Sequence, residues 1–235
     1  MSAVQRVLAE NIAAVRGRMA DAARQSGRAP EDVTLVAVTK YVDVDMAQQV
    51  AEAGCLHLGE SRPQELWRKA ELLVSPRPHW HLVGHLQRNK IRRTLPLVEW
   101  IHSADSLRVL DALQAEAESA GCRARVLLEV NVARDQAKTG LLPEDLVPLA
   151  QRLSSWNALD ICGLMAMSGL GSDRDEARRE FAQVRQLRDR MQTQCPPEVA
   201  LKHLSMGMSD DFAMAILEGA TLVRVGSALF EGIDT

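Results

Sequence analysis

Short apolar segments recur along this chain, and nearly every interval between two of them carries a helical pattern. Each segment is four to nine residues long, which is typical of strands buried inside a sheet. This alternation allows few folds, because strands that alternate with helices pair in parallel. The eight predicted strands span residues 33–39, 55–59, 79–84, 100–103, 125–132, 159–167, 200–205 and 221–225.

Helical spacing of apolar residues predicts the elements between the strands. Eight strand–helix units favour closure into a (β/α)8 TIM barrel, an α/β fold. The alternative is an open doubly wound sheet, which needs a glycine-rich turn after the first strand, where this chain has Thr39, Lys40 and Tyr41. The predicted helices span residues 45–53, 63–73, 89–97, 106–120, 144–153, 175–191 and 211–217.

An extra helix is predicted before the first strand, within residues 1–27. Leu8, Ile12, Val15 and Met19 follow the three- and four-residue spacing of a helix, and Gly27 ends the pattern. No segment has the composition of a linker. We therefore predict a single domain over residues 1–235, with this helix packed outside the barrel or across one end.

Composition excludes several classes of function. The 28 basic and 31 acidic residues give a net charge of −3, which argues against nucleic-acid binding. No apolar run approaches the roughly 20 residues that cross a membrane, and charged residues interrupt the N-terminus where a secretory signal is apolar. The four cysteines form no Cys-x-x-Cys pair. We expect a cytoplasmic protein with reduced, mostly buried thiols.

The active sites of such barrels lie at the carboxyl ends of the strands. After strands seven and eight the chain has glycine and serine next to predicted helix starts, where backbone N–H groups can bind a phosphate. The alternative is that the glycines only form turns and that Ser209 caps a helix. The candidate phosphate-binding residues are Ser205, Gly207, Gly226 and Ser227.

Lys40 ends the first predicted strand, after the apolar run 35–38. A lysine partly desolvated at a barrel mouth has a lowered pKa, and its neutral amine can form a Schiff base with an aldehyde. By position alone, a surface lysine that extends to water fits equally well. A ligand with an aldehyde and a phosphate would be held at both ends, and pyridoxal 5′-phosphate (PLP) is such a ligand.

Motifs along nearly the whole chain resemble the pyridoxal phosphate homeostasis proteins, which are single-domain relatives of the alanine racemase N-terminal barrel (PLP fold type III). Two stretches are highly specific together: the Trp-His and Leu-Gln-x-Asn-Lys pair in 80–90, and Ser-Met-Gly-Met-Ser in 205–209. The other matching segments are 36–40, 59–60, 138–140, 163–165 and 223–226, with Asn131.

The resemblance implies that PLP is bound covalently to Lys40 as an aldimine. It also implies that Ser205, Met206 and Gly207 bind the cofactor together with Gly226 and Ser227, which lie after the last strand. Arg224 would face the pyridine nitrogen and oppose ring protonation. The alternative for Arg224 is an ion pair in the barrel rim.

The chain departs from the family pattern at two places. Ser61 stands where the family usually has asparagine after Gly-Glu, and the second lysine that often follows the cofactor lysine is missing after Lys40. Lys138 matches a family lysine near the site and could replace that second amine, although a solvated loop lysine also fits.

The resemblance implies a PLP carrier that maintains intracellular PLP homeostasis and could deliver PLP to apo-enzymes. The alternative is a PLP-dependent amino-acid racemase with weak activity. A racemase needs acid–base groups on both faces of the substrate, and Tyr41, the only tyrosine, is adjacent to Lys40. We therefore expect no robust catalysis and, without a racemase-type β domain, a monomer.

A metal-dependent hydrolase is a further alternative. His79 and His81 would lie on one side of the third strand, and barrel hydrolases use such pairs as ligands. Such sites also need ligands from other strand ends, and we expect strands five and six to offer no carboxylate. We therefore predict no metal site and place His81 near the cofactor ring as a packing or supporting residue.

Overall fold

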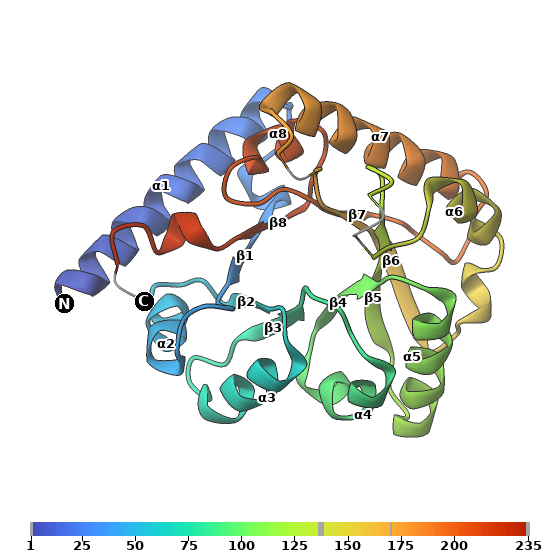
Figure 1. Cartoon of the computed structure of the whole chain (residues 1–235), viewed down its shortest axis with the longest axis horizontal. Helices are drawn as coiled ribbons and strands as arrows, with labels where there is room; N and C mark the ends of the chain where they lie inside the picture. Colours follow the sequence, from blue (N-terminus) through green and yellow to red (C-terminus); the bar gives the residue numbers. More distant parts are fainter. Residues whose placement is uncertain (1, 136–138, 170, 234–235) are drawn as a thin grey trace.

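Eight parallel strands close into a barrel in chain order in the computed structural model, which describes residues 2–135, 139–169 and 171–233 (Figure 1). The first strand pairs with the last, through contacts such as Val36 with Arg224. The predicted (β/α)8 barrel is therefore confirmed. The strands are Thr34–Val38 (β1), His57–Glu60 (β2), His79–Leu82 (β3), Trp100–Ala104 (β4), Ala124–Val130 (β5), Leu159–Ala166 (β6), His203–Ser205 (β7) and Leu222–Val225 (β8).

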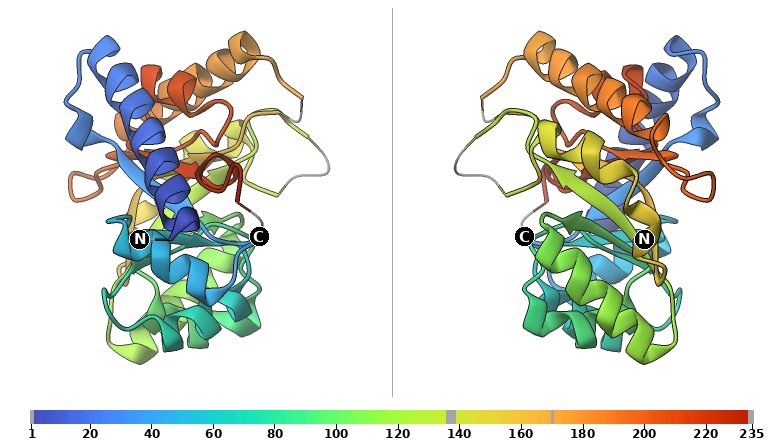
Figure 2. Two further views of the ribbon diagram at one scale, coloured as in Figure 1. Left: turned by 90° about the vertical axis from the view of Figure 1, so that its left-hand side faces the viewer. Right: turned by 90° about the vertical axis from the view of Figure 1, so that its right-hand side faces the viewer.

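Helices surround the barrel (Figures 1 and 2). The predicted extra helix α1 packs on the outside, against α8 and the 3₁₀ turn Ser227–Leu229. Ser2 caps α1 by accepting a hydrogen bond from the Gln5 backbone. The helices are Ala3–Gln25 (α1), Val44–Glu52 (α2), Pro63–Leu72 (α3), Ile91–Thr94 (α4), Leu107–Ala120 (α5), Pro143–Ala150 (α6), Arg174–Gln192 (α7) and Phe212–Leu217 (α8).

Most predicted bounds differ from the structure by at most two residues, and three elements differ by more. The helix predicted over 144–153 ends at Ala150. The continuous helix expected over 89–97 is instead α4 flanked by the 3₁₀ turns Arg88–Lys90 and Leu95–Leu97, because Pro96 has no N–H to continue the helical ladder. The seventh strand begins three residues later than predicted, since the Lys202 backbone donates to Ala200 in a local turn.

The predicted burial of the cysteines holds for only two of the four side chains. Cys55 and Cys162 are buried, whereas Cys195 is partly exposed and Cys122 is exposed. All four thiols are free. Among the described residues, each helix is too short or too polar to cross a bilayer.

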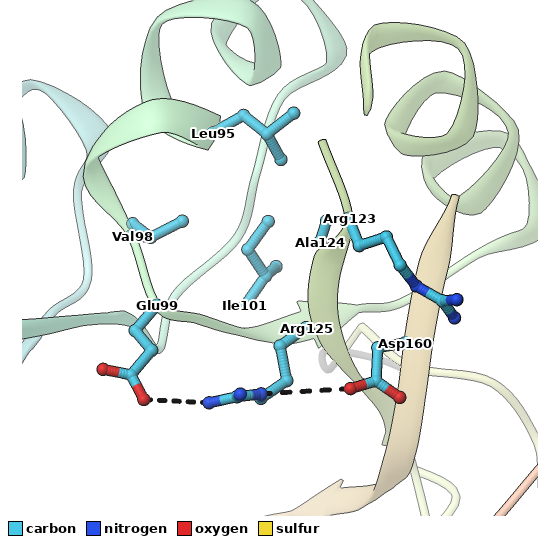
Figure 3. Close-up of a pocket in the computed structure, with 8 residues that line it drawn as sticks. All are labelled: Leu95, Val98, Glu99, Ile101, Arg123, Ala124, Arg125 and Asp160. Atoms are coloured by element: carbon cyan, nitrogen blue, oxygen red, sulfur yellow. Dashed lines mark hydrogen bonds and ion pairs between the residues drawn. The ribbon is translucent and has the colours of Figure 1, made fainter. Parts of the chain in front are cut away.

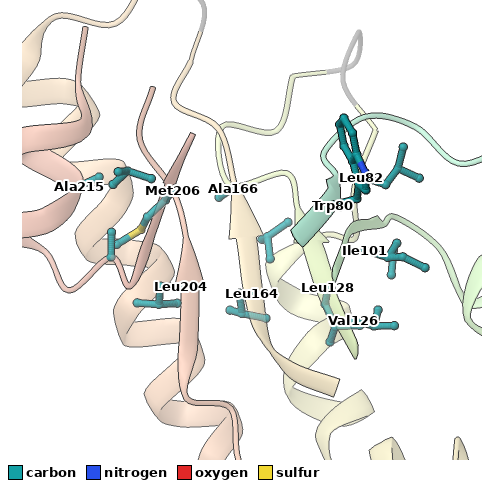
Figure 4. Close-up of a cluster of buried hydrophobic side chains, with 14 of the residues drawn as sticks. Trp80, Leu82, Ile101, Val126, Leu128, Leu164, Ala166, Leu204, Met206 and Ala215 are labelled. Atoms are coloured by element: carbon teal, nitrogen blue, oxygen red, sulfur yellow. The ribbon is translucent and has the colours of Figure 1, made fainter. Parts of the chain in front are cut away.

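Side chains alternate between two layers along each strand, as the strand period of two requires. On β5, Val126 and Leu128 pack toward the helices in the main core, part of which Figure 4 shows. Leu127, between them, belongs to a separate cluster inside the barrel. That inner cluster is small because polar side chains occupy the rest of the interior. Its buried members are Val36, Trp100, Leu127, Cys162, Met165 and Leu222.

Gly163 allows β6 and β7 to approach each other closely. A Cβ at this position would lie 1.8 Å from the carbonyl oxygen of His203, and its φ of +156° is one that other residues rarely adopt. We expect Gly163→Ala to lower the free energy of unfolding by at least about 3 kcal/mol, because the two strands would have to separate. Urea unfolding followed by circular dichroism measures this change.

Gly17→Ala is the matched control. Gly17 lies inside α1, and a Cβ there meets nothing within 4 Å. This variant is expected to be more stable by about 0.5–1 kcal/mol, since alanine favours helix over glycine. Equal effects of the two substitutions would contradict the close approach of β6 and β7.

Candidate functional site

A cavity of about 640 Å³ opens at the carboxyl ends of the strands. Its size lies in the usual range for small-molecule sites, and its position is the one at which TIM barrels place their active sites. The lining residues come from the carboxyl ends of seven strands, all except β4, and from the loops that follow them. They are Val38, Lys40, Tyr41, Val42, Ser61, Val83, Gly84, His85, Glu129, Thr139, Met167, Met208, Ser209, Asp210, Arg224, Gly226, Ser227 and Phe230.

Four of the predicted site residues line this cavity: Lys40, Arg224, Gly226 and Ser227. These four residues therefore reach one cavity, although Lys40 and Ser227 lie 187 positions apart in the sequence. The departure Ser61 also lines it, so the position where the family usually has asparagine faces the site. Lys138 lies outside the described residues.

The other three predicted residues do not line the cavity. Ser205 is fully buried inside the barrel, and its hydroxyl contacts Arg224 and a histidine. Met206 is part of the main hydrophobic core. Gly207 has φ +93°, and a Cβ there would lie 2.6 Å from the Ala215 side chain. The absence of a side chain at Gly207 therefore allows α8 to pack closely against the loop after β7.

Lys40 is exposed at the rim, so the expectation of a partly desolvated lysine is wrong. Its Nζ lies 4.6 Å from the centroid of the Tyr41 ring, whose residue is 80% exposed. The amine is therefore accessible from solvent and from the cavity.

Arg224 is buried with its charge. Its Nη1 donates to the Ser205 carbonyl at 2.7 Å and to the Ser205 hydroxyl at 2.6 Å, and its Nη2 donates to the Ala166 carbonyl at 2.9 Å. Burial lowers the pKa of Arg224 to about 10, so the guanidinium is charged at neutral pH. Among the described residues Arg224 makes no ion pair, in contrast to the rim ion pair considered as an alternative.

Ser209 joins the two candidate phosphate-binding loops. Its hydroxyl accepts hydrogen bonds from the backbones of Gly226 and Ala228, both at 3.3 Å. It does not cap α8, because that helix begins at Phe212. The sequence signal for Ser209 is its place in the Ser-Met-Gly-Met-Ser motif, from which the sequence analysis selected Ser205, Met206 and Gly207 instead.

Glu129 on β5 is a cavity residue that the sequence analysis missed. We expected no carboxylate from strands five and six, and this was wrong. Glu129 is 4% exposed, accepts a hydrogen bond from Thr139 Oγ1 at 2.8 Å, and lines the cavity. Burial raises its pKa. Strand alternation could have identified it, because Glu129 is two residues after the inward-facing Leu127.

A buried ion pair supports the end of β1. Lys69 on α3 donates to Glu60 at 2.6 Å and to the Thr39 carbonyl at 2.7 Å, and both charged side chains are 1% exposed. The Thr39 hydroxyl also donates to Glu60 at 2.7 Å. Glu60 therefore does not line the cavity; with Lys69 it holds Thr39, the residue before Lys40.

The histidines form no metal site in the part of the chain that the structure describes, where no group of three or more candidate ligands could hold an ion. His79 is exposed and pairs with Glu99. His81 is fully buried between His57 and His102, at 2.9 Å from each. It lies in the barrel interior and is not among the residues that line the cavity.

The amino-terminal end of the barrel carries a separate charged cluster. Arg125 lies 2.8 Å from Glu99 and 4.0 Å from Asp160 (Figure 3). These three side chains are all partly exposed. They form a rim at the end of the barrel opposite to Lys40.

Comparison with known proteins identifies the family. The profile of the alanine racemase N-terminal domain matches residues 9–233. A pyridoxal phosphate homeostasis protein of Pseudomonas aeruginosa is 38% identical over 97% of this chain and 96% of its own length. One of Aquifex aeolicus is 35% identical, with 94% and 96% covered. This chain belongs to the pyridoxal phosphate homeostasis protein family.

A solved structure of similar sequence supports the same assignment. PipY of Synechococcus elongatus, with PLP bound, is 36% identical and matches with a TM-score of 0.85 over 95% of this chain and 99% of PipY. The resemblance inferred from the motifs is confirmed over nearly the full length of this family member.

The buried ion pair predicts a large effect of Lys69→Met. We expect the free energy of unfolding to fall by about 3–5 kcal/mol, because Glu60 would be buried without its counter-charge. Urea unfolding measures the loss. The control is Lys202→Met at an exposed lysine, with an expected change within about 0.5 kcal/mol. Adding Glu60→Gln to Lys69→Met should restore part of the loss, and a purely additive double variant would contradict the pairing.

The buried histidines predict that acid destabilises the fold. Burial, and secondarily neighbouring histidines and the cations Arg125 and Arg224, lower the pKa of His81 and His102 well below the usual value. Below pH about 6.5 the unfolded chain therefore binds protons that the folded protein does not. Each histidine should remove about 1.4 kcal/mol of stability per pH unit in that range.

Urea unfolding between pH 7.5 and 5 measures this slope. The His81→Gln, His102→Gln double variant should show a shallower slope than the wild type, even if it is less stable at pH 7.5. A wild-type free energy of unfolding that stays constant over this range would refute the assignment of neutral buried histidines.

Proposed function

We propose that this family member binds PLP in the 640 Å³ cavity and maintains intracellular PLP homeostasis. The observation that carries the proposal is that the Lys40 amine and the Ser209, Gly226 and Ser227 loops line the same cavity as the buried Arg224 guanidinium. Family membership and the PLP bound to PipY support it.

The residues present fit the chemical groups of PLP. Lys40 offers an amine for a covalent bond to the aldehyde. The hydroxyl hydrogen of Ser209 and the backbone N–H of Ser227 offer hydrogen-bond donors to the phosphate, and Gly226, whose N–H donates to Ser209 Oγ, holds that hydroxyl in place. In this assignment Ser205, Met206 and Gly207 shape the loop and support Arg224 and α8. When bound, PLP supplies an electron-accepting ring to amines attached at its aldehyde carbon.

Arg224 is proposed to face the pyridine nitrogen. A guanidinium has no acceptor and stays charged, so it disfavours a proton on that nitrogen. An unprotonated ring is a weaker electron acceptor. We therefore propose a carrier with little catalytic turnover that delivers PLP to apo-enzymes, acts in the cytoplasm and is a monomer.

Glu129 is the observation that favours the racemase alternative. Its buried carboxyl lines the same cavity as Lys40, from β5 instead of β1, and its raised pKa suits proton transfer. Incubation of the PLP-loaded protein with L-alanine in D₂O tests this alternative, because abstraction of the α-proton exchanges it for deuterium. Sustained exchange at ordinary enzyme rates, lost in Glu129→Gln, would contradict a carrier without robust catalysis.

Covalent binding is tested by the visible absorbance spectrum, followed by borohydride reduction and peptide mapping. We expect the visible absorbance band of a Schiff base and a reduced adduct on Lys40. Lys40→Ala should lose the band and the adduct, whereas the control Lys202→Ala, at an exposed lysine outside the cavity, should keep both. A protein that stays colourless with added PLP, or an adduct on another lysine, would refute the assignment.

A further inference from the structure

Five polar side chains form a continuous hydrogen-bonded column inside the barrel. His57 Nδ1 lies 2.9 Å from His81 Nε2, and His81 Nδ1 lies 2.9 Å from His102 Nε2. His102 Nδ1 lies 2.8 Å from Ser205 Oγ, to which Arg224 Nη1 donates at 2.6 Å. The column crosses from β2 through β3, β4 and β7 to β8.

The column connects the two ends of the barrel. His57 lines a cavity at the amino-terminal end, together with Trp100 and Arg125. Arg224 lines the cavity with Lys40 at the carboxyl end. The side chains between them, His81, His102 and Ser205, are fully buried. Their hydrogen bonds must therefore be made within the protein.

The donors and acceptors fix the direction of the column. A guanidinium can only donate, so Ser205 Oγ accepts from Arg224. Among the described residues, His102 Nδ1 is the only acceptor within hydrogen-bond distance of the Ser205 hydroxyl, so the buried hydroxyl hydrogen points to His102 Nδ1, which accepts it. A neutral imidazole with an accepting Nδ1 carries its hydrogen on Nε2. His102 Nε2 therefore donates to His81 Nδ1, and His81 Nε2 donates to His57 Nδ1.

Protonation of the column would break this order. An imidazolium has two donors and no acceptor, so a charged His102 would turn a donor toward the Ser205 hydroxyl and place a second cation near Arg224. In the neutral column, by contrast, each ring nitrogen of His81 and His102 has a matching donor or acceptor.

We propose that His102 is a positioning residue for Arg224, and that His81 and His57 set its tautomer. By accepting the Ser205 hydrogen, His102 turns the lone pairs of Ser205 Oγ toward Nη1 and fixes the plane of the guanidinium that lines the cavity. The backbone bonds from Arg224 to Ser205 and Ala166 hold the group in place but do not depend on the histidines. The consequence for PLP rests on the proposed function.

The tautomers can be measured without PLP. Long-range ¹⁵N–¹H correlation spectra of the full-length apo-protein at pH 7.5 report the state of each of its six histidines. We expect His81 and His102 to be neutral with hydrogen on Nε2. An imidazolium, or hydrogen on Nδ1 of His102, would overturn the proposal, and this measurement needs no variant to fold.

Variants test the link to Arg224. His102→Leu removes the acceptor, whereas the amide oxygen of His102→Asn can replace Nδ1. In His102→Leu we expect the separate, slowly exchanging Nη–H signals of Arg224 to merge or broaden in the apo-protein and the PLP affinity to fall about threefold to tenfold. His102→Asn should recover most of both. His203→Leu is the control, because His203 contacts Trp100 and Thr221 outside the column.

The outcomes separate this inference from the proposed function. If the wild type does not bind PLP but shows the expected tautomers and the Arg224 signals change only in His102→Leu, the proposed function fails and the positioning role stands. If the wild type binds PLP through Lys40 while His102→Leu keeps both the Arg224 signals and the affinity, the positioning role is overturned. Equal losses in His203→Leu and His102→Leu would also overturn it.

Discussion

The barrel interior is organised around a buried positive charge. A guanidinium taken out of water is costly unless its N–H groups find acceptors. Arg224 finds them on the two preceding strands, at Ala166 on β6 and Ser205 on β7. Because these contacts tie β8 to β6 and β7 at their carboxyl ends, the charge and the shape of the cavity mouth depend on each other. A barrel filled only with aliphatic side chains could not accommodate Arg224 at this position.

The polar interior follows from the same requirement. Because Ser205 Oγ accepts a hydrogen bond from Arg224, its own hydroxyl hydrogen needs an acceptor, which is Nδ1 of His102. The other ring nitrogen of His102 is also buried and needs a hydrogen-bond partner of its own. His102 meets this need through His81, and His81 through His57, which lines the cavity at the amino-terminal end of the barrel. The inner apolar cluster is correspondingly small, and the continuous hydrophobic core lies between the strands and the helices.

The fold could be predicted from the sequence because its signal is repeated eight times and each repeat is local. The strand ends also identified Lys40, Arg224, Gly226 and Ser227, since position at a strand end is enough to place a residue on the cavity. The strand ends alone did not place Ser205 and Glu129 correctly. Whether a residue near a strand end faces the cavity or the interior depends on strand alternation and on the exact last residue of the strand, and a shift by one residue reverses the answer. The exposure of Lys40 depends on the loop after β1, which has no periodic signal.

The ion pair behind β1 has a consequence for the reactivity of the site. Glu60 and Thr39 enclose the amine of Lys69, which is 1% exposed, so this lysine cannot meet a reagent from solvent. Lys40 is the only lysine among the described residues that line the cavity. Of these two lysines, an aldehyde that enters the cavity can therefore meet Lys40 and not Lys69. Chemical selectivity between Lys40 and Lys69 is therefore a steric property of the fold.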